Sequence, residues 1–152
     1  MKKKCYYIMI AKVFPAYHYR AGEPTGFKEK ILSGEKIHTI REIGNWKRKI
    51  DEVNAGFAYL SLRQWEGEPY KSKQREFLRL EQAGYEEIYA NNSRIHINGT
   101  HYGHFVFSDV IRNDGLDAWN FREWFPYDSE LFFEPKAIIH FTNFKYSKQQ
   151  RL

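Results

Sequence analysis

Residues 27–41, which read FKEKILSGEKIHTIR, decide the fold of this chain. Apolar residues recur one helical turn apart in the first half of this stretch, so we predict a short helix over residues 26–33. Thr25 can cap the start of that helix, and Gly34 stands where helices commonly end on a glycine. A strand is predicted to follow, from about residue 36 to residue 41.

The predicted strand carries three polar residues that could form a site, Lys36, Thr39 and Arg41. A buried lysine can act as a general base, because burial lowers the pKa of its ammonium group. Thr39 could then be a nucleophile or hold a water molecule, and Arg41 could bind a phosphate or order the site through its fork of donors. Strand side chains alternate, so Lys36 joins the other two only if it lies on a bend after Gly34. Each of the three is also an ordinary residue for a strand or a protein surface.

The rest of the chain is predicted to be rich in strands, with further short helices over residues 44–53 and 117–125. Asp117 can cap the second of these helices, and Asn98-Gly99 favours the tight turn of a hairpin. Six or seven strands with two or three short helices predict an α+β fold in the form of a small β-barrel. The predicted strands other than 36–41 are residues 5–14, 57–65, 73–80, 95–97, 100–102 with its continuation over 104–111, and 136–146.

The composition is that of one globular domain with an excess of positive charge. The chain has 152 residues and a formal charge of +5, which suits a polyanionic ligand. Residues 28–50 hold seven Lys or Arg residues against three Glu, so most of the excess charge lies near the predicted helix and strand. Aromatic residues make up 18% of the chain, and such residues favour strands and also stack on bases.

Several classes of protein are disfavoured by what the sequence lacks. Cys5 is the only cysteine, so an internal disulfide bond is ruled out and a reducing, cytoplasmic location is predicted. No window approaches the ~20 apolar residues of a membrane span. Glycine motifs for phosphates or dinucleotides are absent, and His96, His101 and His104 lack the partners of common metal sites. We therefore predict no membrane contact, no cofactor and no metal.

The pattern Gly34-x-Lys36-x-x-Thr39-x-Arg41 after a short helix resembles the ASCH family, which is related to the PUA RNA-binding domains. Many members of that family have Glu at the position of Thr39. The threonine form resembles the branch that includes the bacterial N4-acetylcytidine amidohydrolase, in which the lysine and the threonine belong to a catalytic set completed by a glutamate. The resemblance implies a single ASCH-type domain with a PUA-like β-barrel.

The glutamate of that family lies just before a helix in the second half of the chain, and residues 112–116, RNDGL, are the corresponding stretch here. Asp114 matches the glutamate best, with a side chain one methylene shorter. Asp117 is the alternative, although it is also the predicted helix cap, and Asn-Asp-Gly is a common turn sequence. Residues 66–104 show no resemblance to the family and are predicted to be an insertion in a single domain of residues 1–152.

Four further residues are candidates for ligand binding. His18 and Arg20 lie in a long loop, residues 15–25, that could line the mouth of the same pocket, and such loops are often functional. Trp46 and Lys47 belong to a basic aromatic patch that could bind RNA. The alternatives are an exposed loop for the first pair and a solvated helix face for the second.

Together these features predict an ASCH-type domain that binds RNA or a modified nucleotide or nucleoside through a basic pocket around Lys36, Thr39 and Arg41. The alternative is an amidohydrolase that deacylates N4-acetylcytidine-like nucleosides, with Lys36 as base, Thr39 as nucleophile or water-holder and Asp114 as carboxylate. A ribonuclease, and a protein-interaction domain that uses a hairpin at residues 92–106, are further alternatives. The oligomeric state is left open.

Overall fold

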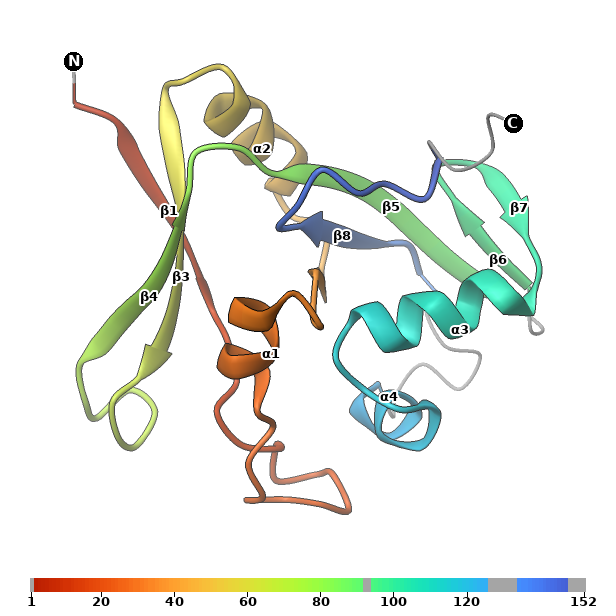
Figure 1. Cartoon of the computed structure of the whole chain (residues 1–152), viewed down its shortest axis with the longest axis horizontal. Coiled ribbons are helices and arrows are strands. Elements are labelled where there is room, and N and C mark those ends of the chain that lie inside the picture. Colours follow the sequence, from red (N-terminus) through yellow and green to blue (C-terminus); the bar gives the residue numbers. More distant parts are fainter. Residues whose placement is uncertain (1, 92–93, 126–133, 148–152) are drawn as a thin grey trace.

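The computed structural model describes residues 2–91, 94–125 and 134–147, and these form an α+β protein of eight strands and four helices (Figure 1). The predicted α+β class is therefore confirmed. In chain order the elements are β1 (Lys4–Met9), α1 (Phe27–Ser33), β2 (His38–Arg41), α2 (Trp46–Asn54), β3 (Ala58–Trp65), β4 (Gln74–Leu80), β5 (Gly84–Asn91), β6 (Arg94–Ile97), β7 (Thr100–Tyr102), α3 (His104–Asn113), α4 (Ala118–Trp124) and β8 (Lys136–His140).

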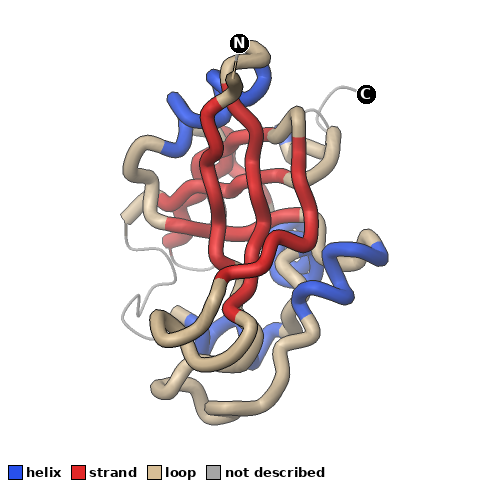
Figure 2. The backbone as a smooth tube through the Cα atoms, turned by 90° about the vertical axis from the view of Figure 1, so that its left-hand side faces the viewer, coloured by secondary structure: helices blue, strands red, loops and turns tan. Residues whose placement is uncertain are grey.

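The strands are arranged in two sheets. One has three strands in the order β1-β3-β4, with β1 parallel to β3. The other is antiparallel and has five strands in the order β2-β8-β5-β6-β7. Figure 2 shows the strands of the first sheet running across those of the second. Strand pairing among the described residues does not close the two sheets into a barrel, so only the coarser α+β architecture of the prediction is confirmed.

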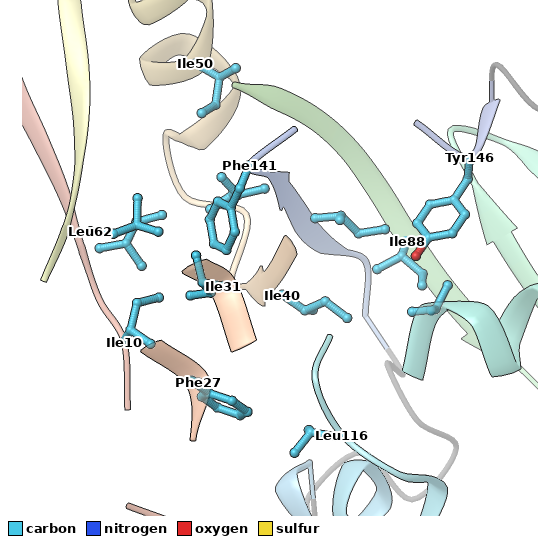
Figure 3. Close-up of a cluster of buried hydrophobic side chains, with 14 of the residues drawn as sticks. Ile10, Phe27, Ile31, Ile40, Ile50, Leu62, Ile88, Leu116, Phe141 and Tyr146 are labelled. Carbon is cyan, nitrogen blue, oxygen red and sulfur yellow. The ribbon is translucent and has the colours of Figure 1, made fainter. Parts of the chain in front are cut away.

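The hydrophobic core lies between the two sheets (Figure 3). Leu62 of β3 and Ile10, which follows β1, enter it from the three-stranded sheet, whereas Ile40 of β2 enters it from the five-stranded sheet. Ile31 of α1 lies between them. Burial of each such side chain stabilises the fold by about 1.5–3 kcal/mol. The core thereby holds α1 between the sheets, together with the segment that leads from α1 into β2.

Several predictions about the ends of elements are confirmed. α1 ends at Gly34, whose φ of 84° is the left-handed conformation expected at a helix C-cap. Asn98 and Gly99 connect β6 to β7 with φ of 50° and 80°, as expected for the predicted hairpin turn. Asp117 caps α4, because its side chain accepts a hydrogen bond of 2.8 Å from the backbone N–H of Asn120.

The predicted strand over residues 104–111 is wrong, because these residues belong to α3. Val106 and Val110 lie one helical turn apart, and both pack against the core. Gly103 precedes the helix in an extended conformation and separates it from β7. The helical spacing is obscured in the sequence by β-branched residues, which by themselves favour strands.

β5 has no counterpart among the predicted strands, although it lies inside the five-stranded sheet and pairs with both β8 and β6. Glu86 and Glu87 interrupt the apolar alternation by which a strand is recognised. Glu86 is nevertheless fully buried. Residues 66–104 thus supply β4, β5, β6 and β7, and their being an insertion relative to the ASCH family stays a prediction.

Gly84 lets β5 approach β8 closely, so we expect Gly84→Ala to destabilise the protein. A Cβ at this position would lie 2.9 Å from the Cβ of His140, its partner on β8. Overpacking costs about 1–3 kcal/mol, and chemical denaturation should show a free energy of unfolding lower by that amount. Gly103→Ala is the control, because a Cβ there meets nothing within 4 Å. Equal losses in the two variants would contradict the prediction.

Candidate functional site

A cavity of about 550 Å³ lies at the junction of β1, α1, β2, α4 and the connection between β3 and β4. Lys36, Thr39, Arg41 and Asp114 all line it. The structure therefore brings together four of the residues that the sequence predicted for one site. A cavity of this volume is in the range of pockets that bind small molecules.

The bend between α1 and β2 gives Lys36 its position. After the C-cap at Gly34, the N–H of Lys36 donates to the carbonyl oxygen of Lys30 at 3.0 Å, so the chain folds back on the end of the helix. β2 begins only at His38, and Lys36 is therefore not subject to the alternation of strand side chains. As a result, Lys36 and Thr39 line the same cavity.

Lys36 is a buried amine with a carboxylate partner. Its side chain is 2% exposed, and Nζ donates to Asp114 twice, to the backbone carbonyl oxygen at 2.6 Å and to Oδ1 at 3.2 Å. Nζ also lies 4.4 Å from the centre of the Phe27 ring. Burial lowers the pKa of Lys36 below its ordinary value, Asp114 opposes this, and the positive charges of Arg41 and Lys30 lower the pKa further.

Asp114 reaches the cavity from the second half of the chain, at the C-cap of α3. Gly115 follows it with φ of 83°, and a Cβ at Gly115 would lie 3.1 Å from the side chain of Lys36. A glycine at this position therefore permits the close approach of the two segments. Asp117, the alternative carboxylate, instead caps α4, so Asp114 is the one that contacts Lys36.

His38 is a member of the site that was not predicted. Its Nδ1 lies 3.3 Å from Oδ1 of Asp114, and its Nε2 lies 2.6 Å from the hydroxyl of Tyr146. Burial lowers the pKa of the His38 ring, and Asp114 opposes that effect. His38 and Lys36 contact the same oxygen of the Asp114 carboxylate. Residues 36–41, KIHTIR, mix polar and apolar residues, so the sequence gives His38 no distinctive local signal.

A second buried polar pair, Glu86 and His140, adjoins this cluster through Tyr146. Oε1 of Glu86 lies 2.8 Å from Nε2 of His140, and both side chains are fully buried. The same Oε1 accepts the backbone N–H of Tyr146 at 2.8 Å, and Oε2 accepts the backbone N–H of Ser147 at 3.1 Å. Burial raises the pKa of Glu86, but the hydrogen bonds from His140 and these two N–H groups outweigh it and lower the pKa. Tyr146 thus links both clusters.

Thr39 and Arg41 form the polar wall of the cavity on β2. Nε of Arg41 donates to Oγ1 of Thr39 at 3.2 Å, and Nη2 donates to the carbonyl oxygen of Met9 at 2.8 Å. Thr39 is buried. The hydroxyl of Thr39 is therefore held at the cavity by a permanent cation, which favours negative charge on its oxygen.

His18 and Arg20 lie outside the cavity lining. His18 is buried, its Nε2 lies 3.1 Å from the carbonyl oxygen of Asn120, and its ring packs 4.5 Å from that of Phe14. Arg20 pairs with Glu23 at 3.2 Å, and its guanidinium lies 4.5 Å from the centre of the Phe14 ring. These contacts attach the long loop to α4 rather than presenting the two side chains to the cavity.

Trp46 and Lys47 also lie outside the cavity lining, on α2. Nζ of Lys49 lies 4.6 Å from the centre of the Trp46 ring, and Nζ of Lys47 lies 3.3 Å from Oδ2 of Asp51 one turn further along the helix. The basic patch is therefore a surface separate from the cavity. Acidic residues on the same helix partly offset its positive charge.

The histidines on the hairpin do not form a metal site with other described residues. The rings of His96 and His101 stack with their centres 4.9 Å apart, and the side chain of His104 lies outside the described part. Within residues 2–91, 94–125 and 134–147, no group of three or more His, Cys, Asp or Glu is placed to hold a metal ion.

Comparisons of this chain with protein-family models, with curated proteins and with solved structures find no match. None of the described helices is both long enough and apolar enough to cross a membrane. The chemistry of the site has to be inferred from its own geometry.

His38 should make the stability of the protein depend on pH. Its pKa is lowered by burial from the ordinary 6.5, so below pH 6.5 the unfolded chain binds a proton there that the folded chain does not. The free energy of unfolding should therefore fall as the pH drops below 6.5.

The variant His38→Gln does not titrate and should remove this dependence between pH 6.5 and 4.5. A further loss below pH 4.5 should persist in both proteins, because the pKa of Glu86 is lowered from 4.5 in the folded state. Urea denaturation across this range would measure both effects. Identical pH dependence of the two proteins above pH 4.5 would show that His38 does not contribute.

Proposed function

We propose that this chain is an amidohydrolase that binds a small acylated nucleoside-like molecule in the cavity and removes its acyl group. The observation that carries the proposal is the buried amine of Lys36, held by Asp114 in a cavity that Thr39 and Arg41 also line. Hydrolysis of an amide needs a base, a nucleophile or activated water, and a group that stabilises the oxyanion. Each of these has a candidate on the wall of the cavity.

Lys36 is the proposed general base. A base must be neutral, and burial favours the neutral amine of a lysine even though Asp114 opposes the shift in pKa. Neutral Nζ takes a proton from the attacking group and, as an ammonium, returns it to the leaving nitrogen. Asp114 holds Nζ through two hydrogen bonds, so the amine stays in one position while its charge changes.

Thr39 can take part in the proposed reaction in one of two ways, as the nucleophile or as the residue that positions the attacking water. As nucleophile, Oγ1 loses its proton to Lys36 and bonds to the acyl carbon, the C–N bond breaks, and the amine leaves with that proton. Water then cleaves the acyl–threonine ester, and one proton of that water passes through Lys36 back to Oγ1. As water-holder, Thr39 instead positions the water that attacks the acyl carbon directly. Arg41 stabilises negative charge beside Oγ1 in either form.

Binding of RNA without catalysis is the second candidate, supported by the net positive charge of the chain. A nucleic-acid strand needs cations along an open surface that can follow the phosphates. Trp46 and Lys47 do not line the cavity, and Lys47 pairs with Asp51. This separation favours a small ligand in the cavity over a strand of RNA.

We also propose that the chain is an ASCH-type domain with a PUA-like arrangement. The succession of α1, Gly34, Lys36 and β2 supports this, together with the place of Asp114 shortly before α4. The branch with threonine in the motif is what implies N4-acetylcytidine as the substrate to test. We also propose a cytoplasmic location, because a chain with a single cysteine, Cys5, has no internal disulfide bond that would need an oxidising compartment.

The protein should hydrolyse N4-acetylcytidine to cytidine and acetate. The reaction can be measured by absorbance or chromatography. Lys36→Met keeps an unbranched side chain but lacks the amine, and it should lower kcat/KM by about 10²–10⁴-fold, the usual contribution of a general base. Lys47→Met is the matched control, because Lys47 is exposed and outside the cavity. Absence of turnover by folded wild-type protein would exclude this substrate, and salt-dependent binding of single-stranded RNA would then support the second candidate.

The rate should rise with pH as Lys36 loses its proton, with a midpoint below 10.5 because burial lowers the pKa. Asp114 raises the pKa of Lys36, so Asp114→Asn should move the midpoint of any remaining activity to lower pH. The measurement is kcat against pH for both proteins. A midpoint that does not move, or that moves to higher pH, would contradict the role of Lys36 as base.

A further inference from the structure

Two aromatic rings stand at the exposed end of the cavity. Trp65 is the last residue of β3, and Tyr70 lies in the connection to β4; both line the cavity. Their ring centres are 5.1 Å apart and the rings are tilted by 49°. Tyr70 is 89% exposed, whereas Lys36 is 2% exposed. The lining of the cavity therefore combines a buried amine with an aromatic pair of which Tyr70 is open to solvent.

The connection that carries Tyr70 is held in place by hydrogen bonds. The N–H of Glu66 donates to the carbonyl oxygen of Lys73 at 2.8 Å, and the N–H of Gly67 donates to Oγ of Ser72 at 2.9 Å. Nζ of Lys12 donates to the carbonyl oxygens of Trp65 and Glu66 at 3.2 and 3.0 Å, which fastens this connection to the chain that follows β1.

Tyr70 adopts a conformation that a bulky residue rarely takes. Its φ of 65° is in the left-handed region, and its ring is almost fully exposed to water. This φ belongs to a turn over residues 68–71, which the N–H of Lys71 closes by donating to the carbonyl oxygen of Glu68 at 3.1 Å. Glycine is the usual residue at this position of such a turn, whereas here the turn carries an exposed aromatic ring that lines the cavity. The surrounding hydrogen bonds hold the ring beside Trp65.

We infer that Trp65 and Tyr70 form an aromatic ledge on which a planar ring of the ligand stacks. The two rings contact each other, so the ligand lies on their surface toward the cavity rather than between them. Stacking selects for flat rings, and the ledge therefore restricts substrates to acyl derivatives of aromatic amines, such as N-acylated nucleobases, over aliphatic amides. This inference rests on the proposed function, because the amide of the same ligand is placed at Lys36.

The test compares acetanilide with N-cyclohexylacetamide, two amides with the same acyl group and a six-membered ring that is flat only in the first. Wild-type protein should prefer acetanilide in kcat/KM. Tyr70→Ala should lower that value for acetanilide by about tenfold, as expected for the loss of one stacked ring, and should lower it less for the aliphatic amide. Tyr70→Phe should retain the preference. Tyr7→Ala is the control, because Tyr7 is also exposed but lies outside the cavity lining.

Quenching of tryptophan fluorescence by N4-acetylcytidine gives a second readout that does not need turnover, with Trp65→Phe identifying the signal of Trp65. The dissociation constant from this quenching should rise about tenfold in Tyr70→Ala. If it does, and neither protein hydrolyses the ligand, the result would support the ledge and exclude the amidohydrolase. Hydrolysis of both amides by Tyr70→Ala at the wild-type rates would support the amidohydrolase and overturn the ledge. Absence of quenching of Trp65 by planar ligands would also overturn the ledge.

Discussion

The contact between Lys36 and Asp114 is the interaction on which both the site and the local fold depend. It joins residues 78 positions apart in the sequence, the bend between α1 and β2 and the end of α3. A buried charge without its partner is strongly destabilising, so each residue requires the other. Gly115 permits the approach of the two segments, and His38 contacts the same carboxylate oxygen as Lys36. The atoms that close this part of the fold are therefore the same atoms that define the chemistry of the cavity.

Arg41 extends this dependence to the relation between the two sheets. β1 belongs to the three-stranded sheet and β2 is an edge of the five-stranded sheet, and no backbone ladder between described strands connects the sheets. The guanidinium of Arg41 bonds to Met9 of β1 with one nitrogen and to Thr39 of β2 with another. It thus joins the sheets at the cavity and holds the hydroxyl of Thr39 in a fixed place. A point charge such as lysine could not make both bonds with the same geometry.

The sequence predicted features that depend on neighbouring residues, such as the caps at Gly34 and Asp117 and the hairpin turn. The predicted cap of α1 at Thr25 was wrong, because Gly26 is the N-cap of that helix. The prediction also failed for residues 104–111, where β-branched residues in a helix favoured a strand, and for β5, where the buried Glu86 looked like a surface residue. Asp114 was predicted through the resemblance to the ASCH family, in which a glutamate lies just before a helix in the second half of the chain. The role of His38 could not be predicted, because it depends on Asp114 and Tyr146, which lie 76 and 108 positions away. Contacts over such distances follow from the fold and leave no local pattern.

The buried polar residues need an explanation, because apolar residues of similar size often stabilise a core at least as well as buried ion pairs. The two pairs here form one connected group, in which Tyr146 bonds to His38 through its hydroxyl and to Glu86 through its backbone N–H. The group is fully buried at Glu86 and His140, and at Lys36 it reaches the cavity. The fully buried end fixes the positions of the groups that hold Asp114, and Asp114 in turn fixes the amine. An amine of lowered pKa that faces a cavity is what the proposed acid–base chemistry requires, and the connected group supplies the contacts that hold this amine in place.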